Sequence, residues 1–368
     1  MFMIGGVFLH HVLMPFGGDE WHVMNAESSA LLDGLMVYFE QVRLPTLFFV
    51  SGAVSWLLLR RTSPGAFTRK RLVRLLVPFV FAVLVVVPPQ TYVEGLPSER
   101  SYLDALPDLM LAFEVNHLWF IEYLVWFVVL SLPLAAVLRR PSVAEWLQGV
   151  LAKPAALLAL GIVPVGVQIA GRLALPDGAP SVLDVGVSGF YLCFYAVGLI
   201  LMSAPAAWRA VRDHRRTFAW ALAITSAVFY AYYLSPDMSP YLSEPVRWGL
   251  WWGLAAAVSW TALLTFAGYA QEHLQWRSAR VEAMNEMVYP FYILHQTVIV
   301  VVAYVVVQWP VGIAAKLLVV LAASLGLTVL ACVALIRPFR PMRVLFGAGG
   351  TPSARPAERL PWSVAEAV

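Results

Sequence analysis

Apolar residues in this chain fall into long stretches, each separated from the next by a short polar segment. A helix needs about 20 mostly apolar residues, with a range of roughly 17 to 25, to cross a bilayer. Nine stretches reach or approach that length: Met36–Leu59, Leu72–Val87, His117–Leu138, Pro154–Leu173, Val182–Met202, Phe218–Leu234, Val246–Phe266, Met287–Gln308 and Gly312–Ile336. A shorter apolar stretch, Met1–Phe16, precedes them. The pattern predicts an all-α protein, a polytopic transmembrane helical bundle of about ten helices with the first one truncated.

The composition agrees with a chain embedded in a bilayer. Of the 368 residues, 60% are hydrophobic and only 13% are charged, whereas a soluble domain carries about 25% charged residues. The net charge of +3 is small and divided between loops, which argues against a nucleic-acid partner. Cys193 and Cys332 lie inside apolar stretches. We therefore expect buried cysteines, and neither a disulfide framework nor a metal site.

The distribution of Lys and Arg predicts the orientation in the membrane. When the polar segments are assigned alternately to two sides, one side holds 20 of the 25 Lys and Arg, and the loops of the other side hold only Arg100. The basic side comprises Arg60–Arg74, Arg139–Lys153, Ser203–Arg216, Gly268–Glu286 and the tail from Arg337. By the positive-inside rule these segments are cytoplasmic. We predict a multi-pass protein of the cell inner (plasma) membrane with both termini cytoplasmic and the lipid bilayer as a partner.

Two cytoplasmic termini require an even number of helices. Met1–Phe16 is either an interfacial piece or the outer half of a tenth helix whose beginning is missing, and this parity favours the second interpretation. We expect residues 1–346 to form the transmembrane domain, with the polar segment Pro88–Asn116 as an outer loop long enough for a lid. The Gly-, Pro- and Ala-rich residues 347–368 are expected to be a disordered cytoplasmic tail.

Ionisable side chains at membrane depth are functional candidates, because each costs a few kcal/mol unless it is paired or solvated. His10 and His11 lie near the outer end of the first stretch, and histidine is well suited to take up and return a proton. Consecutive helix residues point about 100° apart, so only one of the two should face the bundle interior. His295 lies inside another predicted helix, beside Gln296. For each of these histidines, the alternative is a structural hydrogen bond between helices.

His117 and Glu122 lie near the outer end of the same predicted helix. A carboxylate at this depth needs a partner, and the candidates are Arg43, Arg247 or a histidine. The alternative role for Glu122 is a structural ion pair between helices. The other histidines lie in polar segments and are expected to be solvated: His22, His214 and His273.

Arg71 and Arg74 differ from the other cations of their hairpin. They lie three residues apart, on one helical face, at the mouth of the following helix. Two guanidinium groups placed this way could bind a phosphate or pyrophosphate bidentately, and Arg69 is a further candidate. Arg60 and Arg61 are explained by topology and by anionic lipid headgroups.

Five segments, in order, resemble the membrane acyltransferase-3 family: FLHHVLMPF, LPTLFFVSGAVSWLLLRR, RKRLVRLLVPF, HLWFIEYL and YPFYILHQTVIV. Two more, DEWHVMN and PPQTYVEG, look most like the glucan-biosynthesis-C branch. The resemblance covers Val7 to about Phe346. It implies ten or more membrane helices and transfer of an acyl group from cytosolic acyl-CoA to a hydroxyl outside, usually of a sugar.

The family relies on a first-helix histidine and an R-x-x-R arginine pair. The resemblance places the pair on Arg71 and Arg74 and the histidine on His11 or His10. We favour His11 because its spacing to Pro15 fits the branch better. Relatives also carry an arginine before this histidine, and Met1–Phe8 has none.

We therefore expect an O-acyltransferase that moves an acetyl- or succinyl-class group from acyl-CoA to a hydroxyl of an extracytoplasmic glycan or related acceptor, without a bound cofactor. The donor phosphates would bind Arg71, Arg74 and Arg69. The acceptor hydroxyl would be deprotonated, or the acyl group relayed, by His11 or His10. The path between them would be lined by His117, Glu122 and His295. Two other classes stay open: a transporter that uses the same intramembrane groups, and an inactive membrane sensor or scaffold.

Overall fold

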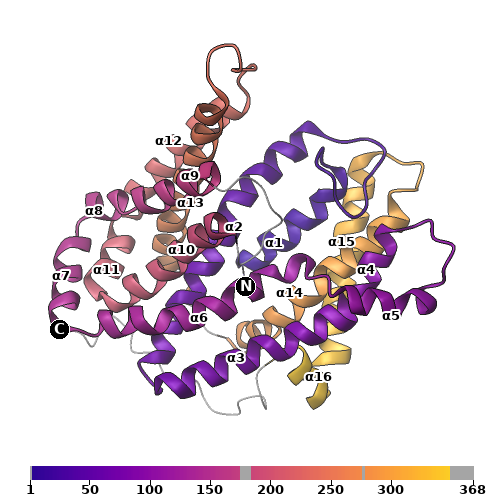
Figure 1. Ribbon diagram of the computed structural model, residues 1–368, viewed down its shortest axis with the longest axis horizontal. Helices are drawn as coiled ribbons and strands as arrows, with labels where there is room; N and C mark the ends of the chain where they lie inside the picture. The colour runs from indigo at the N-terminus through magenta and orange to yellow at the C-terminus, as the bar shows by residue number, and fades with distance from the viewer. Residues whose placement is uncertain (1, 175–183, 276–277, 349–368) are drawn as a thin grey trace.

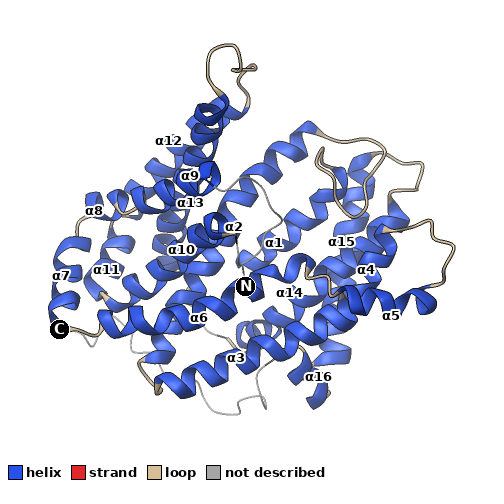
Figure 2. Cartoon of the chain, viewed as in Figure 1, coloured by secondary structure: helices blue, strands red, loops and turns tan. Residues whose placement is uncertain are grey.

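A computed structural model describes residues 2–174, 184–275 and 278–348, and in these ranges every regular element is a helix (Figure 2). The longer helices are α1 (Phe2–Leu13), α2 (Ala30–Leu59), α3 (Pro64–Phe81), α5 (Tyr102–Ala112), α6 (Trp119–Leu138), α7 (Pro141–Leu151), α9 (Ile162–Ala174), α10 (Val185–Ser203), α11 (Pro205–Asp213), α12 (Arg215–Tyr233), α13 (Glu244–His273), α14 (Ala279–Val306) and α15 (Ile313–Ala331). The shorter elements are η1 (Met14–Phe16), η2 (Ala82–Val86), α4 (Pro88–Glu94), η3 (Asn116–Leu118), α8 (Pro154–Ala159), η4 (Cys332–Ile336) and α16 (Arg340–Leu345). The all-α prediction is confirmed.

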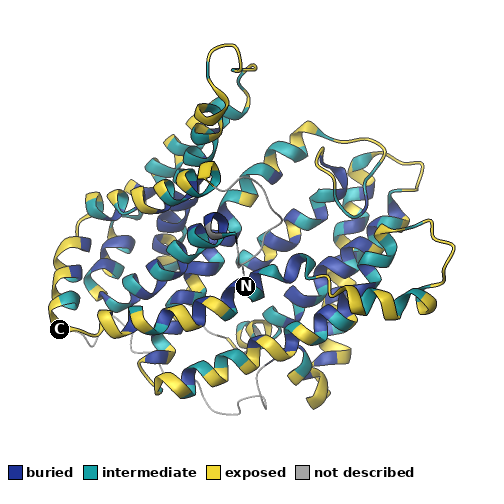
Figure 3. Ribbon diagram, in the orientation of Figure 1, coloured by how far each residue is buried: buried dark blue, intermediate teal, exposed yellow. Residues whose placement is uncertain are grey.

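Eight helical stretches in the described part of the chain are long and apolar enough to cross a membrane: Ala30–Leu59, Pro64–Glu94, Tyr102–Leu138, Pro154–Ala174, Gly186–Ser203, Glu244–His273, Val281–Val306 and Ile313–Ile336. The other two of the ten expected helices are α1, which is shorter, and α12, which is not among these eight. Large apolar residues such as Val73, Leu318 and Leu330 are exposed. Figure 3 shows exposed residues along many of the helices. Lipid tails would cover such a surface, and the protein is a multi-pass membrane protein.

α2 lies at the centre of the bundle and contacts α1, α3, α6, α10 and α13. Its closest approach is to α10. A Cβ atom on Gly52 would overlap the carbonyl oxygen of Tyr195, and one on Gly198 would overlap the carbonyl oxygen of Phe49. Small residues at such a crossing let two helix backbones touch. The crossing fixes the position of α2, which carries residues of two polar sites.

The segment Pro88–Asn116 is mostly helical and is not the open loop that the sequence predicted. α3 continues through a wide turn, in which Val87 N–H donates to the carbonyl of Ala82 (2.9 Å), and then into α4. Proline has no backbone N–H to donate. A proline that follows this turn therefore removes no hydrogen bond from the helix before it. α5 then packs against α4, at the right of Figure 1. Ser101 begins α5 by accepting a hydrogen bond from the backbone N–H of Asp104.

The helices that carry the candidate site lie together. α1, α14 and α15 contact one another on the right side of Figure 1, and α1 also packs on α2. α7 and α11 fold two of the basic segments into short helices that pack against each other. The hairpin between α12 and α13 projects from the bundle at the top of the view.

Candidate functional site

Three histidines from three separate elements meet inside the bundle: His11 of α1, His117 of η3 and His295 of α14. His11 Nδ1 lies 2.8 Å from His295 Nε2. The His117 ring lies edge-on to His295, with 5.3 Å between ring centroids, and 6.5 Å from His11. His295 is fully buried and His117 is 7% exposed. The structure thus brings together three of the predicted site residues.

The hydrogen bonds determine which ring nitrogens carry protons. His295 Nδ1 lies 2.5 Å from the carbonyl oxygen of Tyr292, which can only accept, so this nitrogen carries the hydrogen. In the neutral ring Nε2 is then the acceptor, and His11 Nδ1 donates to it. His11 Nε2 keeps a free lone pair, because no described residue forms a hydrogen bond with it. His11 can therefore take up a proton at Nε2 while it keeps its bond to His295.

His117 presents a second unprotonated nitrogen. Its Nε2 lies 3.1 Å from the carbonyl oxygen of Ile293 and so donates to it. Nδ1 is then the lone-pair nitrogen of the neutral ring, and it is buried with no partner among the described residues. The Tyr292 hydroxyl donates to the backbone carbonyl of His117 (2.5 Å), which fastens η3 to α14. The histidine cluster, defined as His11, His117 and His295, thus offers two proton acceptors, and no described residue donates to either of them.

Arg43 of α2 is a functional candidate that the sequence indicated only as a possible partner of Glu122. Its charge lies within electrostatic range of His10, His11 and His295, and its buried Nε has no partner among the described residues. His10 is 6% exposed and packs edge-on to His11 (5.6 Å). A guanidinium beside neutral imidazoles is placed to stabilise negative charge that forms between them.

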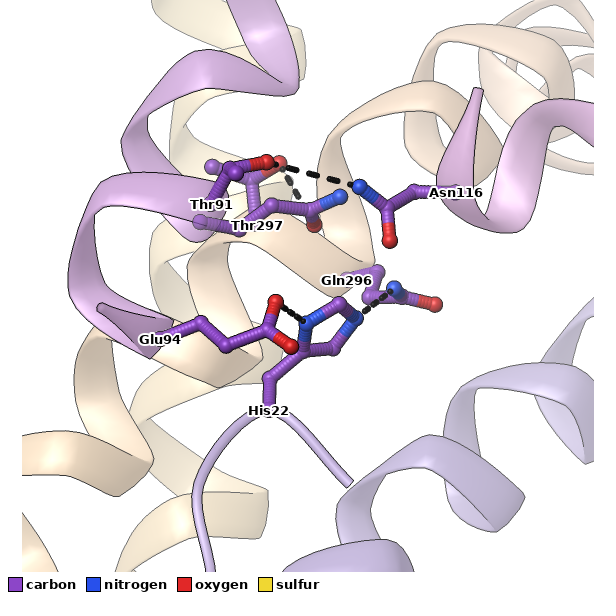
Figure 4. Close-up of polar contacts among 7 residues, drawn as sticks. His22, Thr91, Glu94, Asn116, Gln296 and Thr297 are labelled. Carbon is purple, nitrogen blue, oxygen red and sulfur yellow. Dashed lines mark hydrogen bonds and ion pairs between the residues drawn. The ribbon is translucent and has the colours of Figure 1, made fainter. Parts of the chain in front are cut away.

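A second polar group, the His22 cluster (Trp21, His22, Glu94 and Gln296), adjoins the histidine cluster. The Trp21 ring is nearly parallel to His11 (11°, 6.4 Å between centroids). His22 Nδ1 donates to Glu94 Oε2 (2.5 Å), and Gln296 Nε2 donates to His22 Nε2 (3.0 Å; Figure 4). The prediction that His22 is solvated was wrong, because α4 and α14 leave its side chain only 10% exposed.

Further polar side chains beside α4 and α14 extend the His22 cluster into a polar wall. Asn116 Nδ2 lies 3.5 Å from Thr91 Oγ1 (Figure 4). Thr297 Oγ1 lies 2.7 Å from the carbonyl of Val86 and 3.2 Å from Gln90 Oε1. Gln90 is fully buried, and its Nε2 has no partner among the described residues. DEWHVMN and PPQTYVEG, which carried the resemblance to one branch, therefore supply most of this wall.

Arg71 and Arg74 lie at a different level of the bundle. Arg71 Nη2 donates to Ser55 Oγ (3.1 Å), which also accepts from the Tyr195 hydroxyl (2.8 Å). Arg71 Nε and the Tyr289 hydroxyl are buried without partners among the described residues. The charges of both arginines act on Tyr289. Buried donors without acceptors are costly, and an oxyanion bound here would satisfy them.

Gly347, at the start of the predicted tail, lies against this arginine site. Arg74 Nε donates to the carbonyl of Gly347 (3.3 Å), which has a φ of 64°. A Cβ atom on Gly347 would overlap the Tyr289 ring, so glycine meets both a steric and a conformational requirement here. Ala348 is 7% exposed. The rest of the predicted tail, residues 349–368, lies outside the described residues.

α14 connects the two sites. Tyr289, Tyr292 and His295 follow at intervals of three residues, so Tyr292 neighbours each of the other two, while Tyr289 and His295 themselves lie about 120° apart around the helix. Tyr289 belongs to the arginine site and His295 to the histidine cluster. Six residues of helix place their Cα atoms about 9 Å apart along the axis.

Two predicted site residues stay apart from these clusters. Glu122 is half-buried, and the described residues offer it neither an ion pair nor a hydrogen bond, so the expected partner is absent there. Arg69 is exposed and lies on another face of α3 from Arg71. The sequence signal for both was their charge, which does not report the direction of a side chain.

Most of the chain matches a known protein family. A family model described as an acyltransferase domain matches residues 1–337. Glucans biosynthesis protein C from Escherichia coli K12, and the same protein from strain K12 / DH10B, are 29% identical over 121 residues, which cover 31% of this chain and 31% of the relative. The chain thus aligns with about a third of the length of these curated relatives. No solved structure matches it significantly. By the extent of the family match, this chain belongs to the acyltransferase-3 family of membrane proteins.

Proposed function

We propose that the protein is an O-acyltransferase that moves an acetyl- or succinyl-class acyl group from cytosolic acyl-CoA to a hydroxyl of a glycan on the other side of the membrane. One observation carries the proposal. α14 bears both Tyr289, in a site with buried unsatisfied donors, and His295, which aligns the free lone pair of His11 two turns further along the same helix. A donor bound at the first site and an acceptor at the second would meet inside the bundle.

The arginine site suits the phosphates of the donor. Arg71 Nε and the Tyr289 hydroxyl are buried donors without acceptors, and Arg74 adds a second guanidinium whose present partner is a backbone carbonyl. Phosphate oxygens accept charge-assisted hydrogen bonds from such groups. The hydrogen bond between Arg74 and the carbonyl of Gly347 would have to break when the donor binds.

The histidine cluster suits general-base catalysis. His11 Nε2 takes the proton of the acceptor hydroxyl, and the oxygen attacks the thioester carbonyl carbon. The tetrahedral intermediate carries a negative oxygen that the charge of Arg43 stabilises. The C–S bond then breaks, and the proton on His11 passes to the leaving thiolate. His295 keeps its acceptor role toward His11 throughout.

The His22 cluster suits a polyhydroxylated acceptor. The relatives are named for glucan biosynthesis, and a glucan presents hydroxyls that both donate and accept. Glu94, Gln296 and Asn116 offer matching polar atoms, and Trp21 offers an apolar face on which a sugar ring can stack.

Acyl transfer in inverted membrane vesicles tests the proposal. Labelled acetyl- or succinyl-CoA is supplied on the cytoplasmic face with glucan on the other, and label in the glucan is measured. We expect transfer with wild-type protein and a loss of about 10²–10⁴-fold with His11→Ala at equal protein levels. Glucan flux without consumption of acyl-CoA would instead establish the transporter class.

A further inference from the structure

Three of the helical turns on the basic side converge on a pocket that the proposed function does not use. α2–α3, α6–α7 and α10–α11 each turn here, and the cavity has a volume of about 750 Å³. It is lined by three arginines, by hydroxyl-bearing residues and by an apolar floor. The arginines are Arg60, Arg61 and Arg139. Topology and anionic lipid headgroups were expected to explain Arg60 and Arg61.

The lining of this pocket is strongly cationic. No acidic residue is among the described residues that form it. The first turns of three helices also border it, through Pro64 of α3, Ala144 of α7 and Pro205 of α11. α7 and α11 have no side-chain cap at these ends, so their first N–H groups remain available to an anion. The opposing carbonyl end of α2 is partly neutralised, because Arg139 Nη2 donates to the carbonyl of Leu59 (2.6 Å).

Trp56 gives independent evidence for a ligand. Its side chain lines the pocket and is 5% exposed, yet the indole Nε1–H has no acceptor among the described residues. A buried indole N–H normally finds a partner. With Leu59, Leu138 and Met202 around it, the indole gives the pocket a flat apolar surface beside its cations. Such a surface suits an aromatic base attached to phosphates.

The pocket is adjacent to the arginine site. Leu59 lines the pocket, and Ser55, which binds Arg71, precedes it on α2 by four residues. Four residues are one helical turn, or about 6 Å along the axis. A ligand that extends from the pocket toward the bundle interior would pass Arg71.

We infer that this pocket binds the nucleotide head of the acyl donor, an adenosine bearing a 3′-phosphate and a 5′-pyrophosphate. This inference rests on the proposed function and extends it. Arg60, Arg61 and Arg139 bind the 3′-phosphate and Trp56 contacts the adenine. The 5′-pyrophosphate extends to Arg71 and Arg74, and the arm with the thioester continues toward His11. The shared chemistry is a phosphate ester, which an anionic lipid headgroup also carries.

The test uses the full protein in nanodiscs and the probe adenosine 3′,5′-bisphosphate, which lacks the arm and the thioester. Binding is measured with phosphatidylcholine alone and with added phosphatidylglycerol. We expect Arg60→Gln and Arg61→Gln each to weaken binding about 10-fold. The matched control is Arg140→Gln, a neighbouring exposed cation outside the pocket, which should bind like wild type.

Unchanged nucleotide binding in Arg60→Gln, Arg61→Gln and Arg139→Gln would overturn the inference. Failure of the wild-type protein to bind the nucleotide would also overturn it. If the protein then retained phosphatidylglycerol through these arginines, the pocket would be a lipid site instead. Failure of the proposed function can be distinguished from failure of this inference about the pocket. If the protein binds the probe through these arginines but transfers no acyl group, the pocket stands and the enzyme assignment falls.

Discussion

At the scale of single residues, the decisive contact is the hydrogen bond between His11 and His295. It links residues 284 positions apart in the chain. The sequence indicated both residues as polar groups in apolar stretches and left their structural and catalytic roles open. The direction of this bond, set by the carbonyl of Tyr292, is what makes His11 Nε2 the free base. His10 has the same chemistry one position away and lies beside the cluster.

The first residue-scale prediction concerns His295. His295→Phe removes the acceptor of His11 Nδ1, so the His11 ring loses its fixed tautomer and orientation. We expect kcat to fall roughly 10- to 100-fold, as for other residues that orient a functional histidine. Binding of adenosine 3′,5′-bisphosphate should not change, and this control separates misorientation from misfolding. Full activity of His295→Phe would contradict the proposed role of His11 as an oriented base.

A second residue-scale prediction concerns Arg43. If its charge stabilises the oxyanion, Arg43→Gln should lower kcat by about 10²–10³-fold, and Arg43→Lys should retain part of the rate. Substrate KM should change little, because the oxyanion forms only in the transition state. Steady-state kinetics of both variants checks this expectation. A raised KM at normal kcat would assign Arg43 to substrate binding instead.

At the scale of elements, the crossing of α2 and α10 sets the relative height of the two sites. Arg43 and Ser55 both belong to α2, and Tyr195, which bonds Ser55, belongs to α10. The sequence predicted both helices from their apolar length. Their contact depends on Gly52 and Gly198, whose missing side chains let the backbones meet. Nothing in the apolar pattern indicates which two helices approach this closely.

The element-scale prediction therefore addresses Gly52. Gly52→Ala places a methyl group against the carbonyl of Tyr195 and should destabilise the protein by about 1–3 kcal/mol. Thermal unfolding in detergent measures the change. The matched control is Gly326→Ala in α15, where a Cβ atom meets nothing within 4 Å. Equal unfolding temperatures for the two variants would show that α2 and α10 are not in backbone contact.

At the scale of the whole molecule, the charge bias predicts that the hairpin after α2 is cytoplasmic and the hairpin after α12 is not. We test this with single cysteines at Thr62 and Ser239, in a background with Cys193→Ala and Cys332→Ala. A membrane-impermeant thiol reagent added to intact cells should label Ser239→Cys. It should label Thr62→Cys only after the membrane is opened. The opposite pattern would invert the orientation and place the arginine site outside.

The sequence alone determined the class of the protein, because the length and polarity of each stretch decide locally whether it can span a bilayer. It also determined which residues are chemically unusual, since charge and proton affinity are properties of single side chains. Tertiary structure decided which of those residues meet. His11, His117 and His295 converge, and His22 joins Glu94, whereas Glu122 has no partner among the described residues and Arg69 is exposed. The physical reason is that the direction of a side chain in the bundle depends on helix packing, which close contacts such as that at Gly52 fix and the hydrophobic pattern does not record.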